Sequence, residues 1–100
     1  MSFQLVVRPE VDADLRAAEL WYESRRSGLG AEFLQTVRKA MSRLPDNPFR
    51  NPIRDRRFQV RWSYPRPFPY RIVYRVIQDT VVIYPVIHTA RHEHHWQKRR

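Results

Sequence analysis

Several residue types are scarce in this chain of 100 residues, and each scarcity narrows what the protein can be. The chain has no cysteine, which excludes disulfides, zinc ribbons and thiol catalysis and fits a reducing compartment. Its only glycines are Gly28 and Gly30, so it lacks a glycine-rich phosphate-binding loop. No apolar run approaches the roughly 20 residues of a membrane span, and the N-terminus lacks the layout of a signal peptide. We therefore expect a cytoplasmic protein without a membrane partner.

Lysine is also scarce, because 17 of the 19 basic residues are arginine. The formal net charge is +9, and it is distributed unevenly. Residues 1–32 carry four arginines and six acids, a net charge of −2, whereas residues 33–100 carry a net charge of +11. Arginine binds phosphate and carboxylate through a planar fork, so we expect an anionic partner: nucleic acid, a nucleic-acid enzyme or an acidic protein. A genome rich in GC is an alternative explanation for part of the arginine excess.

Length and periodicity predict one domain, residues 1–100, that begins with a strand and two helices. Alternating apolar residues predict a short strand over residues 3–8, and Pro9 then suits the first turn of a helix. Apolar residues at helical spacing extend this helix to about Arg26. The two glycines mark a tight connection, and a second helix runs from Leu29 until Pro45 stops it. The two helices should form a hairpin whose apolar stripes rest on a sheet.

A basic loop over residues 45–57 separates the helices from three predicted strands. Alternating residues place these strands at 58–64, 70–77 and 81–88. Pro85 cannot donate to a ladder of hydrogen bonds, so the last strand should lie at an edge or carry a bulge. The order β-α-α-β-β-β predicts an α+β fold in which the helical hairpin packs on one face of a four-stranded, mostly antiparallel sheet.

The strand over residues 70–77 sorts its side chains into two sets, which should lie on opposite faces of the sheet. The apolar set is Tyr70, Ile72, Tyr74 and Val76, and the other set contains Arg71, Val73 and Arg75. Antiparallel neighbours pair face to face, so basic residues of adjacent strands should converge on the face that the helices leave uncovered. The residues predicted to gather there are Arg61, Arg71, Arg75, His88 and Arg91. The alternative for each is an ordinary solvated or hydrogen-bonded surface residue.

The four histidines, His88, His92, His94 and His95, invite a metal-site interpretation. Two histidines four residues apart can chelate a metal on a helix, but His88 belongs to a predicted strand. The segment from His92 onward is not an H-E-x-x-H motif, because Trp96 occupies the position of the second histidine. We therefore expect no metal and no cofactor.

One stretch and one later strand carry a family resemblance. They are Phe68-Pro69-Tyr70-Arg71-Ile72-Val73-Tyr74-Arg75 and Val86-Ile87-His88-Thr89-Ala90-Arg91. Together with the helix pair that ends at Leu44-Pro45, they resemble the RelE/ParE superfamily of toxins from type II toxin–antitoxin systems, over nearly the whole chain. The resemblance implies a small bacterial toxin neutralised by a co-expressed antitoxin that wraps its helices and sheet. The helix residues expected to bind the antitoxin are Leu15, Tyr22, Phe33 and Val37.

Two activities occur in this superfamily, and the residues can be compared with the needs of each. RelE-like members cleave mRNA in the ribosome, which requires cations on the phosphate together with a base and an acid. On this interpretation the catalytic residues are Arg61, Arg71, His88 and Arg91, with Tyr84 and Asp55 as further candidates for the base or acid. The lysine-rich strand and C-terminal tyrosine of many RelE-like nucleases have no clear counterpart, since Lys39 and Lys98 lie elsewhere.

ParE-like members poison DNA gyrase without being nucleases. On this interpretation the chain is not an enzyme, and its target-binding or anion-binding residues are Arg61, Arg71, Arg75, Arg91 and Trp96. The basic ending of residues 91–100 resembles the ParE-like branch, although the proline usual in that tail is absent. We favour a ParE-like toxin, with DNA gyrase as its target, over the alternative of a ribosome-dependent mRNA endoribonuclease. A small basic RNA-binding module is the remaining alternative.

Overall fold

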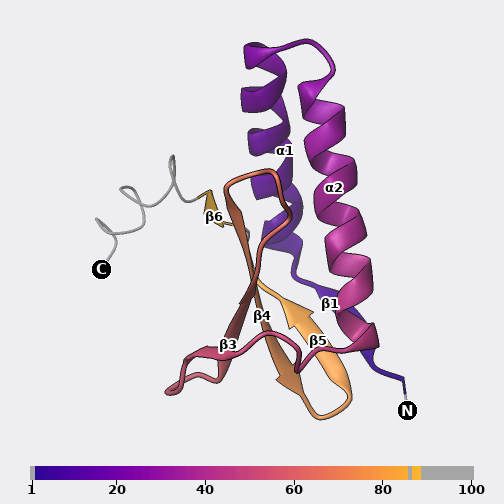
Figure 1. The fold of residues 1–100 in the computed structure, drawn as a ribbon, viewed down its shortest axis with the longest axis vertical. Helices are drawn as coiled ribbons and strands as arrows, with labels where there is room; N and C mark the ends of the chain where they lie inside the picture. Colours follow the sequence, from indigo (N-terminus) through magenta and orange to yellow (C-terminus); the bar gives the residue numbers. More distant parts are fainter. Residues whose placement is uncertain (1, 86, 89–100) are drawn as a thin grey trace.

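The structure is a computed structural model that describes residues 2–85 and 87–88, and it shows a helical hairpin standing on a sheet (Figure 1). The elements in chain order are β1 Gln4–Val7, α1 Pro9–Arg25, α2 Leu29–Arg43, the 3-10 turn η1 Leu44–Asp46, β2 Ile53–Asp55, β3 Val60–Ser63, β4 Tyr70–Ile77, β5 Thr80–Ile83 and β6 Ile87–His88. Within the part of the chain that is described, neither helix is long and apolar enough to cross a membrane.

The turn between the two helices is held by backbone geometry and one carboxylate. Gly28 has a φ of +87°, in the left-handed region that favours glycine. Gly30 is buried, and a Cβ at this position would lie only 2.6 Å from the backbone oxygen of Glu19 on α1. The Glu23 carboxylate accepts hydrogen bonds from the backbone N–H groups of Gly28 and Gly30, both at 2.9 Å. These observations confirm the predicted tight connection at the two glycines.

The strands form one mixed sheet in the order β1-β5-β4-β3-β2. Strand β1 runs parallel to β5, and the other neighbours are antiparallel, while β6 pairs with the first residues of β4. The predicted α+β fold and element order are confirmed, but the prediction of four strands is wrong. Strand β2 forms inside the predicted loop through its pairing with β3, and the predicted last strand is divided into β5 and β6 around Tyr84 and Pro85. Pro85 lacks the N–H that would continue the ladder.

The core lies between the helical hairpin and the central strands β4 and β5. The apolar side of β4 is confirmed, because Tyr70, Ile72 and Tyr74 are each at most 1% exposed. Phe33 of α2 reaches this layer, with its ring centroid 4.6 Å from that of Tyr70 and 5.3 Å from that of Phe68. None of the residues of β3 and β1 is fully buried, so the sheet extends beyond its helical cover on both sides.

The structure places the helix residues predicted to bind the antitoxin in the hydrophobic core. Leu15, Tyr22, Phe33 and Val37 are between 0% and 7% exposed and belong to the hydrophobic core. Their helical spacing is the spacing of the face that packs on the sheet, and Leu15 and Tyr22 also line surface grooves beside the helices. The rings of Tyr22 and Phe33, for example, stack on each other with centroids 5.1 Å apart.

Candidate binding site on the open sheet face

The face of the sheet that the helices leave uncovered carries basic and aromatic side chains. In the register of the strands, Trp62 of β3 is opposite Val73 of β4, and Arg75 of β4 is opposite Val82 of β5. Residues directly opposite each other in an antiparallel pair share one face, so Trp62 lies on the same face as Arg71 and Arg75. We call the set Arg8, Arg54, Trp62, Arg71, Arg75 and Tyr84 the arginine–tryptophan face.

Trp62 organises the arginines around it. The guanidinium carbon of Arg71 lies 3.9 Å from the centroid of the Trp62 ring, and that of Arg54 lies 5.4 Å from it. At the other side of the face, the guanidinium carbon of Arg8 lies 5.6 Å from the centroid of the Tyr84 ring. Cation–π contacts of this kind contribute about 0.5 to 2 kcal/mol each, depending on desolvation. They hold the planar forks in place while leaving their outer N–H groups for a ligand.

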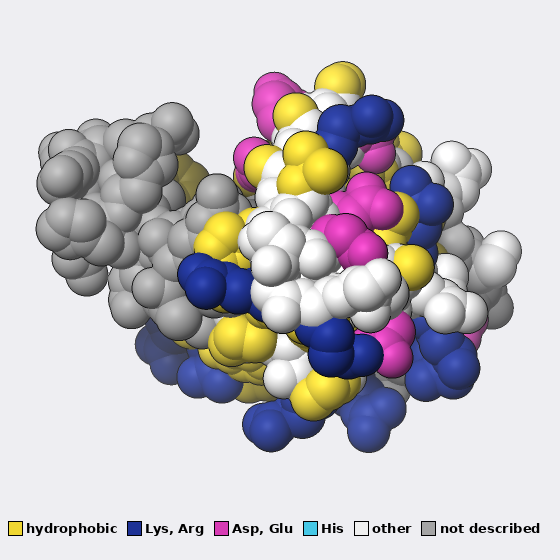
Figure 2. Space-filling view, turned by 90° about the horizontal axis from the view of Figure 1, so that it is seen from above, with side chains coloured by type: hydrophobic (Ala, Val, Ile, Leu, Met, Phe, Trp, Pro, Cys, Tyr) yellow, Lys and Arg dark blue, Asp and Glu magenta, His cyan; other side chains and the backbone are white. Residues whose placement is uncertain are grey.

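Apart from Arg8, which pairs with Glu10, the arginines of this face lack counter-charges among the described residues. The Nε atoms of Arg71 and Arg75 are buried and have no hydrogen-bond partner within residues 2–85 and 87–88. The ion pairs of this part of the chain are Arg8–Glu10 at 3.5 Å and Arg26–Glu32 at 2.7 Å, both involving acids of the helices. Figure 2, a view onto the hairpin end, shows acidic side chains over the helices and Lys and Arg side chains along much of the lower rim.

Two acids of the later part of the described chain, Asp55 and Asp79, accept local hydrogen bonds away from this face. The carboxylate of Asp55 accepts a hydrogen bond from the backbone N–H of Arg57 at 3.0 Å, and that of Asp79 accepts one from the Thr80 hydroxyl at 3.2 Å. Asp55 therefore stabilises the turn after β2, and its carboxylate is engaged there. Within the described residues, no group of three His, Asp or Glu side chains is placed to hold a metal ion.

The prediction that Arg61 joins this face is wrong. Arg61 is opposite Tyr74, whose side chain is buried on the helical side, so Arg61 also points to that side. Its guanidinium donates to the backbone oxygen of Phe49 at 3.4 Å and to that of Asn51. The helices do not cover β3, and the loop beside it supplies carbonyl oxygens that need donors. An arginine therefore takes a position that strand alternation would give to an apolar residue.

The other predicted site residues differ in how far the structure describes them. Arg71 and Arg75 lie on the same face, as predicted, whereas only the backbone of His88 is described, in register with Tyr70. Arg91 and Trp96, like the remaining histidines, lie outside the described residues.

The sequence interpretation missed Trp62, Arg54 and Arg8 as members of the face. The sequence feature that could have identified Trp62 is its alternation with Arg61. This alternation shows that the two side chains point in opposite directions. It does not fix which of the two points toward the helices.

Comparisons with known proteins give the chain its family. The family model described as the ParE toxin of the type II toxin–antitoxin system parDE matches residues 5–93. A solved structure titled as the chromosomal ParDE toxin–antitoxin system from P. aeruginosa is similar, with a TM-score of 0.65 and 18% sequence identity. The similarity covers 84% of this chain and 92% of that chain, and at this identity it supports the fold. No curated protein matches the chain. The chain therefore belongs to the ParE toxins of type II toxin–antitoxin systems, whose partner is a cognate antitoxin.

Proposed function

We propose that this toxin inhibits DNA gyrase in the cytoplasm through the arginine–tryptophan face, and that its antitoxin prevents this inhibition. The family match supports the toxin activity, and one structural observation supports the surface. Arg71 is stacked on Trp62 at 3.9 Å, with a buried Nε that has no partner among the described residues. A guanidinium that is fixed in place and lacks a counter-charge is prepared to bind an anionic group of another molecule.

Binding is a better account of this face than cleavage. Nuclease chemistry needs a base and an acid besides cations, with both placed within hydrogen-bond reach of the reacting oxygens. The described side chains of the face are arginines, Trp62, Tyr84 and aliphatic residues, with no carboxylate or imidazole among them. Arginines and aromatic rings are also the residues that dominate the energy of protein interfaces. These observations favour a non-enzymatic inhibitor over an endoribonuclease.

The experiment compares two activities on one preparation of the toxin. DNA supercoiling by gyrase and mRNA cleavage on programmed ribosomes are measured with wild type, Arg71→Ala and Arg71→Lys. We expect wild type to inhibit supercoiling and to leave mRNA intact. Arg71→Ala should raise the inhibitory concentration about tenfold, the effect of losing about 1.4 kcal/mol of binding free energy. Arg71→Lys should be intermediate at best, because lysine keeps the charge but not the stacked fork.

Arg16→Ala is the matched control, because Arg16 is an exposed residue of α1 away from the sheet face. This variant should inhibit gyrase as well as wild type does. An equal loss in both alanine variants would show that total charge matters and the face does not. Cleavage of mRNA by wild type, lost in Arg71→Ala, would replace the gyrase proposal with the endoribonuclease.

A further inference from the structure

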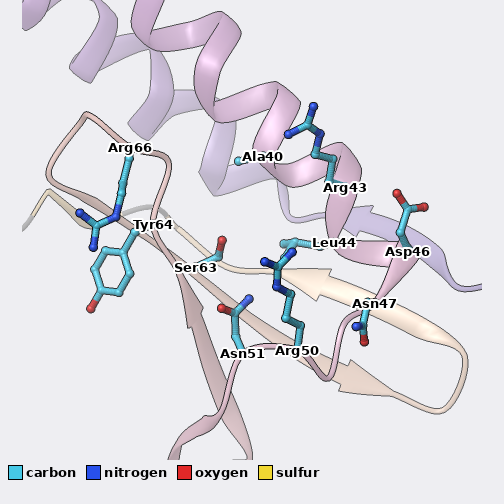
Figure 3. Close-up of a pocket in the computed structure, with 10 residues that line it drawn as sticks. All are labelled: Ala40, Arg43, Leu44, Asp46, Asn47, Arg50, Asn51, Ser63, Tyr64 and Arg66. Carbon is cyan, nitrogen blue, oxygen red and sulfur yellow. The ribbon is translucent and has the colours of Figure 1, made fainter.

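A second group of arginines lies on the opposite side of β3, in a pocket beside the end of α2 (Figure 3). The cavity has a volume of about 560 Å³. Its principal lining residues are Arg43, Leu44, Arg50, Asn51, Tyr64 and Arg66. They come from three segments: the end of α2 with the start of η1, the loop after η1, and the connection between β3 and β4. We call this cavity the arginine pocket.

The loop that carries Arg50 is fixed to the sheet on both sides of that residue. The guanidinium of Arg61 donates to the backbone oxygens of Phe49 and Asn51, the two neighbours of Arg50. The buried hydroxyl of Tyr74 donates to the backbone oxygen of Pro48 at 2.8 Å, and the Asn51 side-chain amide donates to this hydroxyl at 3.1 Å. The position of Arg50 is therefore set by bonds to the core.

The other two arginines also stand on anchored backbone. Arg43 occupies the last turn of α2, directly before Leu44, which is buried. The backbone N–H of Arg66 donates to the carbonyl of Tyr64 at 3.0 Å, and the turn that follows is anchored by Phe68, which is buried in the core. Figure 3 shows the three arginines at separate places around the cavity, with Arg66 to the left of Arg50 and Arg43 above it at the end of α2. The guanidinium groups are thus spread along the cavity rather than gathered at one point.

The charge of the pocket is uncompensated. Asp46 is the one acid among its lining residues, against three arginines. None of these arginines forms an ion pair with another residue of the described chain. The carbonyl end of α2 offers no N–H donors to an anion, so binding would rely on the guanidiniums and on the side-chain amides of the loop. This donor set suits a ligand that carries several separate negative charges.

We propose that the arginine pocket binds the phosphodiester backbone of a single nucleic-acid strand. Spaced guanidiniums match successive phosphates, and the ring of Tyr64, whose residue is 41% exposed, offers a surface on which a base can stack. Leu44 and Ala40 supply an apolar floor that an acidic peptide would not need. DNA and RNA share this backbone chemistry. The proposal goes beyond gyrase inhibition and does not depend on it, because the pocket and the arginine–tryptophan face lie on opposite sides of the sheet.

The test measures fluorescence anisotropy of labelled strands with the full chain. The probes are oligothymidine and oligouridine of about 12 nucleotides and a DNA duplex of the same length. The main variant combines Arg43→Gln, Arg50→Gln and Arg66→Gln. The matched control combines Arg16→Gln, Arg25→Gln and Arg38→Gln, which removes the same charge from exposed helix positions. Circular dichroism verifies that both are folded, and Arg50→Gln alone is used if the triple pocket variant is not.

We expect the wild-type chain to bind single strands more tightly than the duplex. The pocket variant should bind them at least tenfold more weakly, and its salt slope should fall by about 2, because each phosphate contact on a single strand contributes about 0.7. The control should change the affinity less than threefold. Comparison of oligothymidine with oligouridine shows whether DNA or RNA is preferred.

Tyr64→Ala separates base stacking from plain charge. It should weaken oligothymidine binding about fivefold or more and leave binding of inorganic polyphosphate unchanged. Equal losses in the pocket and control variants would overturn the proposal, as would absent binding, a preference for duplex, or tighter binding of a polyglutamate peptide than of either strand. Because no gyrase is present in this assay, its failure would leave the gyrase proposal intact, and failure of the supercoiling assay would leave this one intact.

Discussion

Tyr74 connects the hydrophobic core to a surface loop through hydrogen bonds. It is fully buried in β4, yet its hydroxyl donates to Pro48 and accepts from Asn51, so it connects the sheet to the loop of the arginine pocket. Burial raises the pKa of Tyr74, with smaller opposing effects from Asn51 and Arg61. The hydroxyl therefore remains protonated at physiological pH and able to donate.

Tyr74→Phe should lower the free energy of unfolding by about 1 to 3 kcal/mol, because it leaves the Pro48 carbonyl without its donor. Urea denaturation followed by circular dichroism measures the change. Tyr64→Phe, at a position that is 41% exposed, is the control and should change stability by less than about 0.5 kcal/mol. If Tyr74→Phe were as stable as wild type, the loop would be held by Arg61 and not by the tyrosine.

At the scale of elements, the helical hairpin depends on the Glu23 carboxylate at its turn. Its bonds to the backbone N–H groups of Gly28 and then Gly30 lower the pKa of Glu23 in the folded chain, assisted by the nearby charge of Arg26. A carboxyl group whose pKa is lowered on folding stabilises the fold above its unfolded pKa, which is about 4.3. That contribution disappears as the pH falls through the lowered folded value.

Glu23→Gln should therefore be less stable than wild type at pH 7, and the difference should shrink below about pH 4.3. Thermal denaturation of both chains between pH 3 and pH 7 measures it. The low-pH end is an internal control, because protonation of Glu23 makes the charge difference between the two side chains smallest there. A difference that stays constant over this range would mean that the amide loses packing or geometry and that charge is not involved.

The elements also show what the sequence could and could not predict. Local backbone chemistry sets where the helices begin and end, through Pro9, the two glycines and Pro45. The predicted bounds therefore agree with α1 and α2 to within about two residues. Strand β2 exists only because Ile53–Asp55 pairs with β3, and such tertiary pairing leaves little trace in a loop rich in proline and arginine.

The predicted orientation of the β3 side chains was wrong for a related reason. Alternation fixes that Arg61 and Trp62 point in opposite directions, but the direction of each depends on how far the helices extend over the sheet. Of the candidate site, the sequence predicted the chemistry and two of its residues, Arg71 and Arg75. It could not predict the contact between Arg71 and Trp62, because that contact depends on the register of β3 against β4.

At the scale of the whole molecule, the charge asymmetry of the sequence becomes a spatial one. The acids of residues 1–32 lie largely on the helices, while most arginines of residues 33–88 lie on the sheet around β3 and in the loops beside it, with Arg38 and Arg43 on α2. Two basic surfaces therefore lie back to back across a single strand. A large anionic partner can approach this part of the molecule from either side under an attractive field.

This field predicts how the toxin associates with its cognate antitoxin if the antitoxin is acidic where it binds. Charge attraction acts before contact, so salt should change the association rate far more than the dissociation rate. Stopped-flow measurements between low and high ionic strength should show the association rate constant falling by a factor of 10 to 1,000, roughly the range of electrostatic steering. Exposed Arg56 and Arg57, in the turn after β2, provide a matched test.

Replacing both with glutamine should slow association and flatten its salt dependence, whereas the same change at Arg16 and Arg25 on α1 should have a smaller effect. An association rate constant that does not change with ionic strength would mean that the first contact of the antitoxin is with an apolar surface of the toxin. The exposed residues Leu5, Val6 and Val7 of the edge strand β1 would then be the place to look, since they are 37% to 47% exposed.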